Sequence, residues 1–248
     1  MPGYEVASRG HFFLLFVNLC HIAASREAQE GNRDYLIEAA LKCEQGGCDG
    51  ITVHLREDRR YIKDRDVFAI KDAIRGKLNI EIPLSNEIIK IAKKVKPYQV
   101  TMVPEKSEEM TAGGGFDIRQ NEDRIRDAVK LFRDQDILVS LSVAPDIETI
   151  ELSKECGADF IEIHTGKYCN ATDKTEIDRE LDRIYGAANH AVKLGLKICA
   201  GHGLTYKNIM PVLYARALEQ VNIGHSIISR SLSIGLPKAV EEMLDILD

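Results

Sequence analysis

The sequence alternates between short β-type segments and longer helix-type segments, and it does so eight times. The β-type segments are apolar runs with β-branched residues, and the segments between them place apolar residues at helical spacing among good helix formers. The predicted strands span residues 12–19, 50–55, 79–82, 99–103, 137–143, 160–164, 196–200 and 221–223. The predicted helices span residues 35–45, 66–75, 86–96, 122–134, 147–156, 176–194, 206–217 and 237–247.

This alternation predicts a closed barrel. A strand followed by a helix, repeated along the chain, gives parallel strands joined by right-handed crossovers. The chain has 248 residues, or about 31 per repeat, and a (β/α)8 barrel typically needs about 250 residues. An open doubly wound sheet also alternates in this way, but no GxGxxG fingerprint follows any predicted strand. We therefore expect an α/β protein with one (β/α)8 TIM barrel domain over residues 1–248, because no linker or low-complexity tract divides the chain.

Composition narrows the class of partner. The net charge of −6 offers no basic surface for nucleic acid, and the composition argues against a membrane protein. The apolar run at residues 12–17 resembles the core of a signal peptide, but it has only six residues before Asn18 interrupts it. The six cysteines form no CxxC pair, so a reducing, cytoplasmic location is the simpler interpretation. We expect a small-molecule partner, since a local positive pocket for a phosphorylated metabolite is compatible with an acidic average charge.

Most of the histidines fall where a barrel enzyme keeps its active site. Such enzymes place their catalytic groups at the carboxyl ends of the strands and in the loops that follow. A single histidine is more often structural, but several on one rim favour a functional site. The histidines at or just beyond predicted strand ends are His21, His54, His164, His202 and His225.

Carboxylates accompany these histidines. Glu81 lies in the third predicted strand, and Glu105 lies just beyond the fourth. Glu162 precedes His164 by two residues in the sixth strand, so both side chains lie on the same face. We expect both to face inward, because an outward glutamate would be buried without a partner. Histidines and glutamates without an obvious nucleophile suit multistep proton transfer through carbonyl, imine or enol intermediates.

Glycines after the last two predicted strands indicate phosphate binding. AGHGL (Ala200–Leu204) ends the seventh strand, and NIGH (Asn222–His225) ends the eighth. The loops after strands seven and eight are the usual phosphate site of such barrels, and glycine N–H groups at helix N-termini can approach an anion closely. Each pattern alone would also fit an ordinary tight turn.

Two further segments have open interpretations. HLREDRR (His54–Arg60) directly follows the second strand, and Arg56 is the arginine that we expect to face the site; a solvated loop with internal salt bridges is the alternative. TAGGG (Thr111–Gly115) is a candidate mobile loop, or a plain surface connection.

A Schiff-base aldolase would need a lysine at a strand end, but Lys167 is better explained as a surface residue. Metal-dependent hydrolysis is disfavoured because the chain has no HExxH.

Five segments together resemble the pyridoxine 5′-phosphate synthase family, in the family's order and from about Val17 to the last helix. They are GITVHLREDRR (Gly50–Arg60), VPEK (Val103–Lys106), FIEIHTG (Phe160–Gly166), AGHGLTY (Ala200–Tyr206) and NIGH (Asn222–His225). The resemblance implies a (β/α)8 barrel with additional short helices, in a cytoplasmic homo-octamer that needs no metal or organic cofactor. The implied activity is that of a transferase in vitamin B6 biosynthesis. It condenses 3-amino-2-oxopropyl phosphate with 1-deoxy-D-xylulose 5-phosphate to give pyridoxine 5′-phosphate, phosphate and water.

The resemblance also implies roles for individual residues. His54 and Glu81 would be general bases, His202 the general acid, and Glu162 a supporting proton-transfer group. The amino-ketone phosphate would be held by Asn18, Gly203, Gly224 and His225. The deoxyxylulose phosphate would be contacted by His21, Arg56 and Thr111. The loop that contains Thr111 would close over the site to exclude water.

The chain departs from the family pattern at substrate-contacting positions. Cys20 stands in place of an aspartate, Gln29 of an arginine and Tyr61 of a histidine, and the fifth strand ends in Ala144 where an aspartate is more typical. A lost charge-assisted contact weakens binding by about 1.5 to 3 kcal/mol. Two alternatives therefore stay open: a paralogue acting on a different phosphorylated carbonyl compound, and a phosphometabolite-binding protein without turnover.

Overall fold

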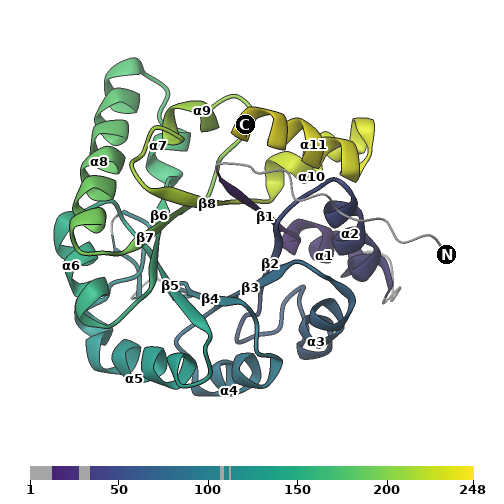
Figure 1. The fold of residues 1–248 in the computed structure, drawn as a ribbon, viewed down its shortest axis with the longest axis horizontal. Coiled ribbons are helices and arrows are strands. Elements are labelled where there is room, and N and C mark those ends of the chain that lie inside the picture. The colour runs from purple at the N-terminus through teal and green to yellow at the C-terminus, as the bar shows by residue number, and fades with distance from the viewer. Residues whose placement is uncertain (1–12, 28–33, 107–108, 112) are drawn as a thin grey trace.

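The protein is a closed barrel of eight parallel strands surrounded by helices (Figure 1). A computed structural model describes residues 13–27, 34–106, 109–111 and 113–248. The strands pair in chain order, and β8 closes the barrel against β1. They are β1 Leu14–Asn18, β2 Gly50–His54, β3 Lys77–Ile82, β4 Gln99–Met102, β5 Leu138–Val143, β6 Phe160–His164, β7 Lys197–Gly201 and β8 Leu218–Ile223. The predicted (β/α)8 fold is confirmed.

The helices form the outer ring of the barrel (Figure 1). Long amphipathic helices follow most strands, and shorter ones follow β1, β6 and β7, as the resemblance implied. The described helices are α1 Cys20–Glu27, α2 Asp34–Gln45, α3 Asp64–Ala73, α4 Asn86–Val95, η2 Arg119–Asn121, α5 Glu122–Arg133, α6 Ile147–Glu155, α7 Gly166–Asn170, α8 Lys174–Lys193, α9 Ile209–Val212, α10 His225–Ile234 and α11 Leu236–Leu247.

The helix predicted over residues 206–217 is wrong, because α9 covers only Ile209–Val212. The Asn208 side chain accepts a hydrogen bond from the Thr205 N–H at 2.7 Å. This bond builds a turn where the predicted helix would begin. Pro211 then provides no N–H for a helical hydrogen bond. The chain therefore makes one short helical turn between β7 and β8.

Helix α10 was not among the eight predicted helices. Only Ile227 of its ten residues is buried, so its sequence has little helical periodicity of apolar residues. It begins immediately after β8, between that strand and the long helix α11. Its N-terminus therefore lies at the carboxyl end of the barrel, which is where additional helices bind phosphate in this fold.

The inside of the barrel is polar, whereas the layer between strands and helices is apolar. Thr101 donates a hydrogen bond to Asn79 at 2.9 Å, and Asn79 donates to Thr52 at 3.3 Å. Thr52 donates in turn to Asn222 at 3.3 Å, so the bonds connect β4, β3, β2 and β8. This network lies beneath the carboxyl ends of the strands and fixes Asn222, which contacts the site described below.

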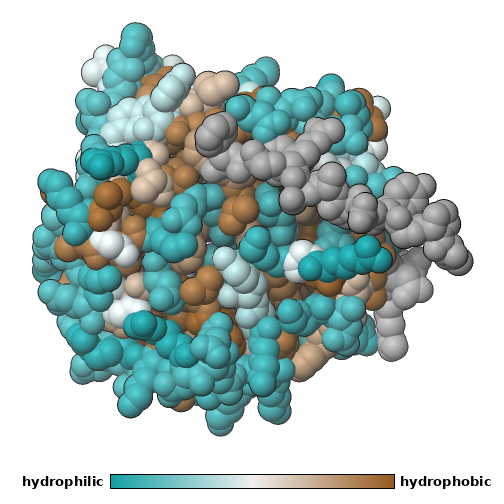
Figure 2. Space-filling model, viewed as in Figure 1, coloured by the Kyte–Doolittle hydropathy of each residue, from teal (hydrophilic) through white to brown (hydrophobic). Residues whose placement is uncertain are grey.

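The face seen in Figure 1 is mainly hydrophilic at its rim. Figure 2 shows hydrophilic side chains around most of the rim of the face seen in Figure 1. No helix in the described ranges is long and apolar enough to cross a membrane.

Candidate active site

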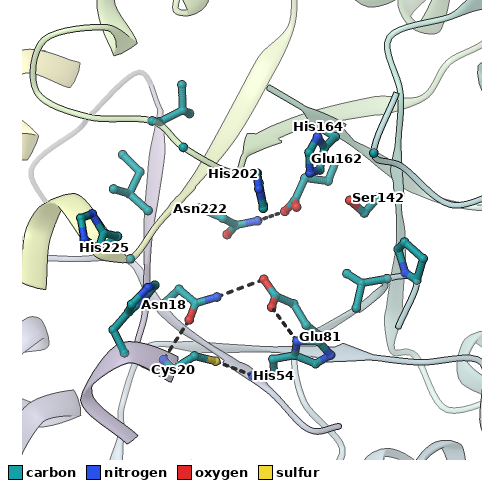
Figure 3. A pocket seen from close by; sticks show the side chains of 18 of the residues that line it. Asn18, Cys20, His54, Glu81, Ser142, Glu162, His164, His202, Asn222 and His225 are labelled. Carbon is teal, nitrogen blue, oxygen red and sulfur yellow. Dashed lines mark hydrogen bonds and ion pairs between the residues drawn. The ribbon is translucent and has the colours of Figure 1, made fainter. Parts of the chain in front are cut away.

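Residues at or just beyond the carboxyl ends of all eight strands line one cavity of about 490 Å³ (Figure 3). The cavity opens at the rim where the sequence places five histidines, and all five of them line it. Glu162 and His164 both face inward, as predicted. The cavity gathers nine of the predicted site residues: Asn18, His21, His54, Glu81, Glu162, His202, Gly203, Gly224 and His225.

Arg56 and Thr111 are not part of this cavity wall. The Arg56 guanidinium lies near Asp58, with 3.4 Å between Nε and Oδ1, and 4.0 Å from the Glu105 carboxylate. The N–H and the hydroxyl of Thr111 both donate to the Gly115 carbonyl, at 2.9 and 3.2 Å, and close a hairpin. Contact of a substrate with Arg56 or with Thr111 therefore stays a prediction. Gln29 lies outside the described residues.

Glu81 and His54 face each other on neighbouring strands, because the β2–β3 register pairs them directly. The Glu81 carboxylate accepts a hydrogen bond from Asn18 Nδ2 at 3.1 Å, and its other oxygen lies 3.8 Å from His54 Nδ1. Burial raises the pKa of Glu81, while His54 and Asn18 oppose this effect. A carboxylate with a raised pKa is a stronger base, so Glu81 is suited to remove a proton near neutral pH.

Glu105 orients the His54 ring from the other side. Its Oε1 lies 3.0 Å from His54 Nε2, and its Oε2 accepts the Glu57 N–H at 3.2 Å. Burial raises the pKa of Glu105, but the hydrogen bonds from His54 and Glu57 outweigh that effect and leave it lowered. Glu105 is therefore an ionised partner of His54. The sequence placed it near the rim without indicating this pairing.

Glu162 lies across the cavity on β6, where Asn222 Nδ2 donates a hydrogen bond to its Oε2. Burial raises the pKa of Glu162 to about 8, and the charge of Glu81 adds to this effect. Glu162 thus keeps its proton near neutral pH. The site can therefore present a basic carboxylate and a protonated carboxyl at the same time.

A Glu162→Gln variant tests this protonation state through stability. A raised folded-state pKa means that folding is opposed wherever the carboxyl is ionised in the unfolded chain and must take up a proton to be buried in the fold. This effect is absent below about pH 4 and grows as pH rises toward 8. Glutamine mimics the protonated form, so its stability advantage over wild type should be at least about 1 kcal/mol larger at pH 8 than at pH 5. Urea unfolding at both pH values measures the difference. Parallel stability curves would contradict the assigned protonation state.

His202 lies on the side of the cavity opposite His54 (Figure 3). It follows β7 with a backbone φ of 77°, a left-handed conformation that is uncommon outside glycine. Thr165 helps to hold this turn, because its hydroxyl lies 2.8 Å from the carbonyl oxygens of both Gly201 and His202. The strained turn presents the His202 ring to the cavity.

The loops after β7 and β8, where the sequence predicts a phosphate site, form another side of the cavity. Gly224 precedes α10, so N–H groups at the start of a ten-residue helix point toward the cavity edge. The rings of His21 and His225 meet edge to face with centroids 5.2 Å apart. Burial lowers the pKa of His21, and the neighbouring His225 lowers it further. Backbone donors and two imidazoles thus surround a position suited to an anion.

Gly224→Ala tests this anion position. A Cβ at Gly224 would lie 2.9 Å from the Asn18 carbonyl oxygen, so the start of α10 or the end of β1 must shift. We expect KM for a substrate whose phosphate binds there to rise about tenfold or more, with a smaller change in kcat, because a charge-assisted hydrogen bond is weakened. Gly186→Ala is the matched control, since nothing lies within 4 Å of its added Cβ. Equal kinetics for the two variants would contradict an anion site at Gly224.

Within the described ranges, no group of three or more His, Cys, Asp or Glu side chains is arranged to hold a metal ion.

The cavity wall also contains residues that the sequence did not indicate as site residues. Asn222 and Ser142 are examples, and each lies in a strand with polar residues at every second position, such as Gln220 before Asn222 and Ser140 before Ser142. That alternation was a usable signal for inward-facing polar side chains.

Comparison with known proteins identifies the family. The model of the family described as Pyridoxal phosphate biosynthesis protein PdxJ matches residues 15–248. The chain belongs to the PdxJ family. A relative in Geotalea daltonii named pyridoxine 5′-phosphate synthase is 45% identical over 232 residues, covering 94% of this chain and 97% of the relative. A relative of the same name in Neisseria meningitidis serogroup A is 46% identical over 230 residues, covering 93% and 95%.

Solved structures of other proteins share the barrel. KGPDC from Streptococcus mutans matches with a TM-score of 0.66 at 11% identity, covering 95% of this chain and 97% of that one. Phosphoribosyl anthranilate isomerase from Thermus thermophilus matches with a TM-score of 0.60, also at 11% identity, covering 95% and 98%. At this identity, the likeness concerns the fold alone.

Three of the four departures named above lie in the described part of the chain: Cys20, Tyr61 and Ala144. Ala144 is buried just beyond β5 and is not part of the cavity wall. Cys20 lines the cavity, and its Sγ accepts the His54 N–H at 3.1 Å. Burial, together with the charge of Glu81, raises the pKa of Cys20 to about 12, so the thiol at this position is neutral. Tyr61 lies outside the cavity wall, where its ring packs against the apolar core.

Proposed function

We propose that this member of the PdxJ family condenses 3-amino-2-oxopropyl phosphate with 1-deoxy-D-xylulose 5-phosphate, and releases pyridoxine 5′-phosphate, phosphate and water. The observation that carries the proposal is the division of the cavity into three parts. One side holds two general bases, Glu81 and His54. The other side holds His202 and a carboxyl that keeps its proton, Glu162. An anion position lies at the edge, next to α10.

This arrangement matches the chemistry of ring closure. Imine formation and dehydration each need a proton removed from nitrogen or carbon and another delivered to a departing oxygen, and enolisation needs a proton removed from carbon and another delivered to the carbonyl oxygen. His54, oriented by Glu105, and Glu81 take up protons on one side of the substrate. His202 delivers a proton on the other side, and Glu162 supports it. Groups fixed on opposite walls can act in turn without large rearrangement.

The two phosphates define where the substrates lie. The amino-ketone phosphate lies against Asn18, Gly203, Gly224 and His225. The deoxyxylulose phosphate is contacted by His21, and by Arg56 and Thr111 from outside the wall. The described part of the Thr111–Gly115 loop lies against the barrel rim, and a Cβ at Gly113 would come within 2.4 Å of the Ala144 Cβ. This position supports a role for the loop in covering the site, because a cover that excludes water favours dehydration.

We further propose one barrel domain over residues 1–248, assembled as a homo-octamer in the cytoplasm. The described strands and helices extend from Leu14 to Leu247, and Tyr214 and Leu232 expose 76% and 86% of their surface to solvent on the outer side. Exposed apolar side chains of this size suit contacts between subunits. All six cysteines are free, which suits a reducing compartment. Light scattering coupled to gel filtration should give the mass of eight chains, and the mass of one chain would contradict this assembly.

Cys20→Asp tests the departure inside the cavity. We expect KM for one of the two substrates to fall about tenfold or more, because aspartate restores an ionised acceptor beside Asn18 and His54. Cys20→Asn is the matched control, since it has the same shape without the charge. Steady-state kinetics with each substrate varied in turn measure the effect. Unchanged KM values in Cys20→Asp would show that the thiol does not limit substrate recognition.

Turnover by the purified protein tests the proposed function directly. Wild type with both substrates should form pyridoxine 5′-phosphate, identified by chromatography and mass. Tight binding of one substrate without product would instead favour a phosphometabolite-binding protein. Product from another phosphorylated ketone, with none from this pair, would favour a paralogue with different specificity.

A further inference from the structure

His164 lines the cavity but has no place in the proton transfers proposed above. Its ring stacks on the ring of His202, with centroids 4.1 Å apart and planes inclined by 30°. One glycine approaches it from the Thr111–Gly115 loop and another from the start of α7. A Cβ at Gly114 would lie 2.7 Å from His164 Cε1, and a Cβ at Gly166 would lie 2.6 Å from the same atom. Only glycine allows both backbones to approach the ring this closely.

The environment of His164 is unlike that of an acid or a base. Its Nδ1 is buried without a hydrogen-bond partner among the described residues. Burial lowers the pKa of His164 to about 4, and the neighbouring His202 adds to this effect. The ring is therefore uncharged at neutral pH and contacts its surroundings as a flat aromatic surface.

The stacked pair also separates two cavities. A second cavity of about 370 Å³ shares His164, His202 and Gly114 with the active-site cavity. Its other walls include Lys167 and Arg179, which are hydrophilic. The two rings and the Gly114 backbone thus form a partition between the active site and a polar space beyond it.

We propose that His164 is a positioning residue that holds the His202 ring in its orientation and couples that ring to the hairpin at Gly114. The hairpin is defined by the Met110–Phe116 bridge and the Thr111 N–H to Gly115 carbonyl bond. The hairpin lies against the His164 ring at Gly114, Gly166 approaches the same edge of the ring, and the ring completes the partition. Removal of the ring frees His202 to rotate and joins the two cavities. The inference rests on the proposed role of His202 as general acid.

The first test compares His164→Ala with His164→Phe. Alanine removes the stacking surface, so kcat should fall about thirtyfold or more while KM changes less than about threefold, because a misplaced acid affects the chemical step. Phenylalanine keeps a flat ring and should retain kcat within about threefold of wild type. Its kcat should also keep the wild-type pH profile between pH 5.5 and 9, because the native ring is uncharged there. His190→Ala, which removes a histidine on α8 paired with Glu151, is the matched control.

Three results would overturn the proposal. The first is wild-type kcat in His164→Ala. The second is equal loss in His164→Ala and His164→Phe when both retain the wild-type Tm. The third is a missing limb in the pH profile of His164→Phe, which would make His164 itself a proton donor. The two variants also distinguish failure of this inference from failure of the proposed function. If His202→Asn is inactive but His164→Ala is fully active, His202 keeps its role as general acid and His164 has no positioning role.

A double-mutant cycle tests the coupling without relying on the fold of His164→Phe. Gly114→Ala places a Cβ against the His164 ring, and its φ of 88° adds strain of its own. We expect Gly114→Ala to lower kcat about tenfold or more in wild type and about threefold or less in His164→Ala, since the clash is then absent. Equal effects in the two backgrounds would show that the hairpin and the ring act independently.

Discussion

Replacing Glu81 with glutamine should lower kcat by about 10³-fold, because the substitution removes the basic carboxylate and little else. Glutamine has nearly the same shape and keeps an oxygen that can accept the Asn18 hydrogen bond. Burial holds the pKa of the native carboxyl above its ordinary value, so the lost group is a stronger base than a solvated glutamate. Steady-state kinetics with both substrates at saturation measure the change.

The control for this variant is Glu151→Gln on α6, an exposed glutamate that pairs with His190 far from the cavity. It should retain wild-type kcat. The Tm of Glu81→Gln should be no lower than that of wild type, since a neutral side chain replaces a desolvated carboxyl. A folded Glu81→Gln enzyme with kcat within about tenfold of wild type would assign the base role to His54 alone.

His202→Asn should lower kcat by about 10²- to 10⁴-fold, the range expected when a general acid is removed. Asparagine is the suitable replacement because it tolerates the left-handed backbone conformation of this position, where φ is 77°. The Thr165 hydroxyl can still bond to the carbonyl oxygen of residue 202, so the turn after β7 should persist. Loss of activity can then be attributed to the missing ring.

The division of the effect of His202→Asn between KM and kcat matters as much as the size of the fall in kcat. KM for both substrates should change less than about fivefold, because His202 acts on the departing oxygen and not on the phosphates. Isothermal titration with the amino-ketone phosphate checks that binding persists. A large loss of binding with kcat nearly unchanged would make His202 a phosphate ligand and not the acid.

The fold could be predicted because each strand and helix has its own periodicity. Eight apolar β-type runs at regular spacing are enough to indicate a closed barrel. The exceptions have local causes. The turn held by Asn208 competes with the helix predicted over residues 206–217, and α10 has one buried residue, so it lacks an apolar stripe. Side-chain capping and weak amphipathicity are the features that periodicity does not detect.

The candidate site was predictable only in part. Strand ends and the family resemblance selected His54, Glu81, Glu162 and His202, and all four line the cavity. Their partners were not predictable, because Asn222 meets Glu162 from two strands away and Glu105 meets His54 from the loop after β4. Such pairings depend on barrel curvature and register and not on local sequence. The roles assigned to these residues stay predictions until the variants are measured.

The departures from the family pattern affect the cavity unequally. Cys20 changes the charge of the wall, because a neutral thiol contacts the His54 backbone. Tyr61 lies outside the wall and packs on the core, so its effect on a substrate would act through the loop after β2. The base side and His202 are both present in the cavity. We therefore expect altered substrate affinity with the same chemistry.

Phosphorus NMR of a single reaction mixture tests the central claim most directly. Wild type with both substrates should release inorganic phosphate and form pyridoxine 5′-phosphate in equal amounts and at the same rate. Glu81→Gln and His202→Asn, at the same concentration, should form neither product at a comparable rate. Phosphate release without pyridoxine 5′-phosphate, or equal rates in wild type and both variants, would contradict ring closure by this site.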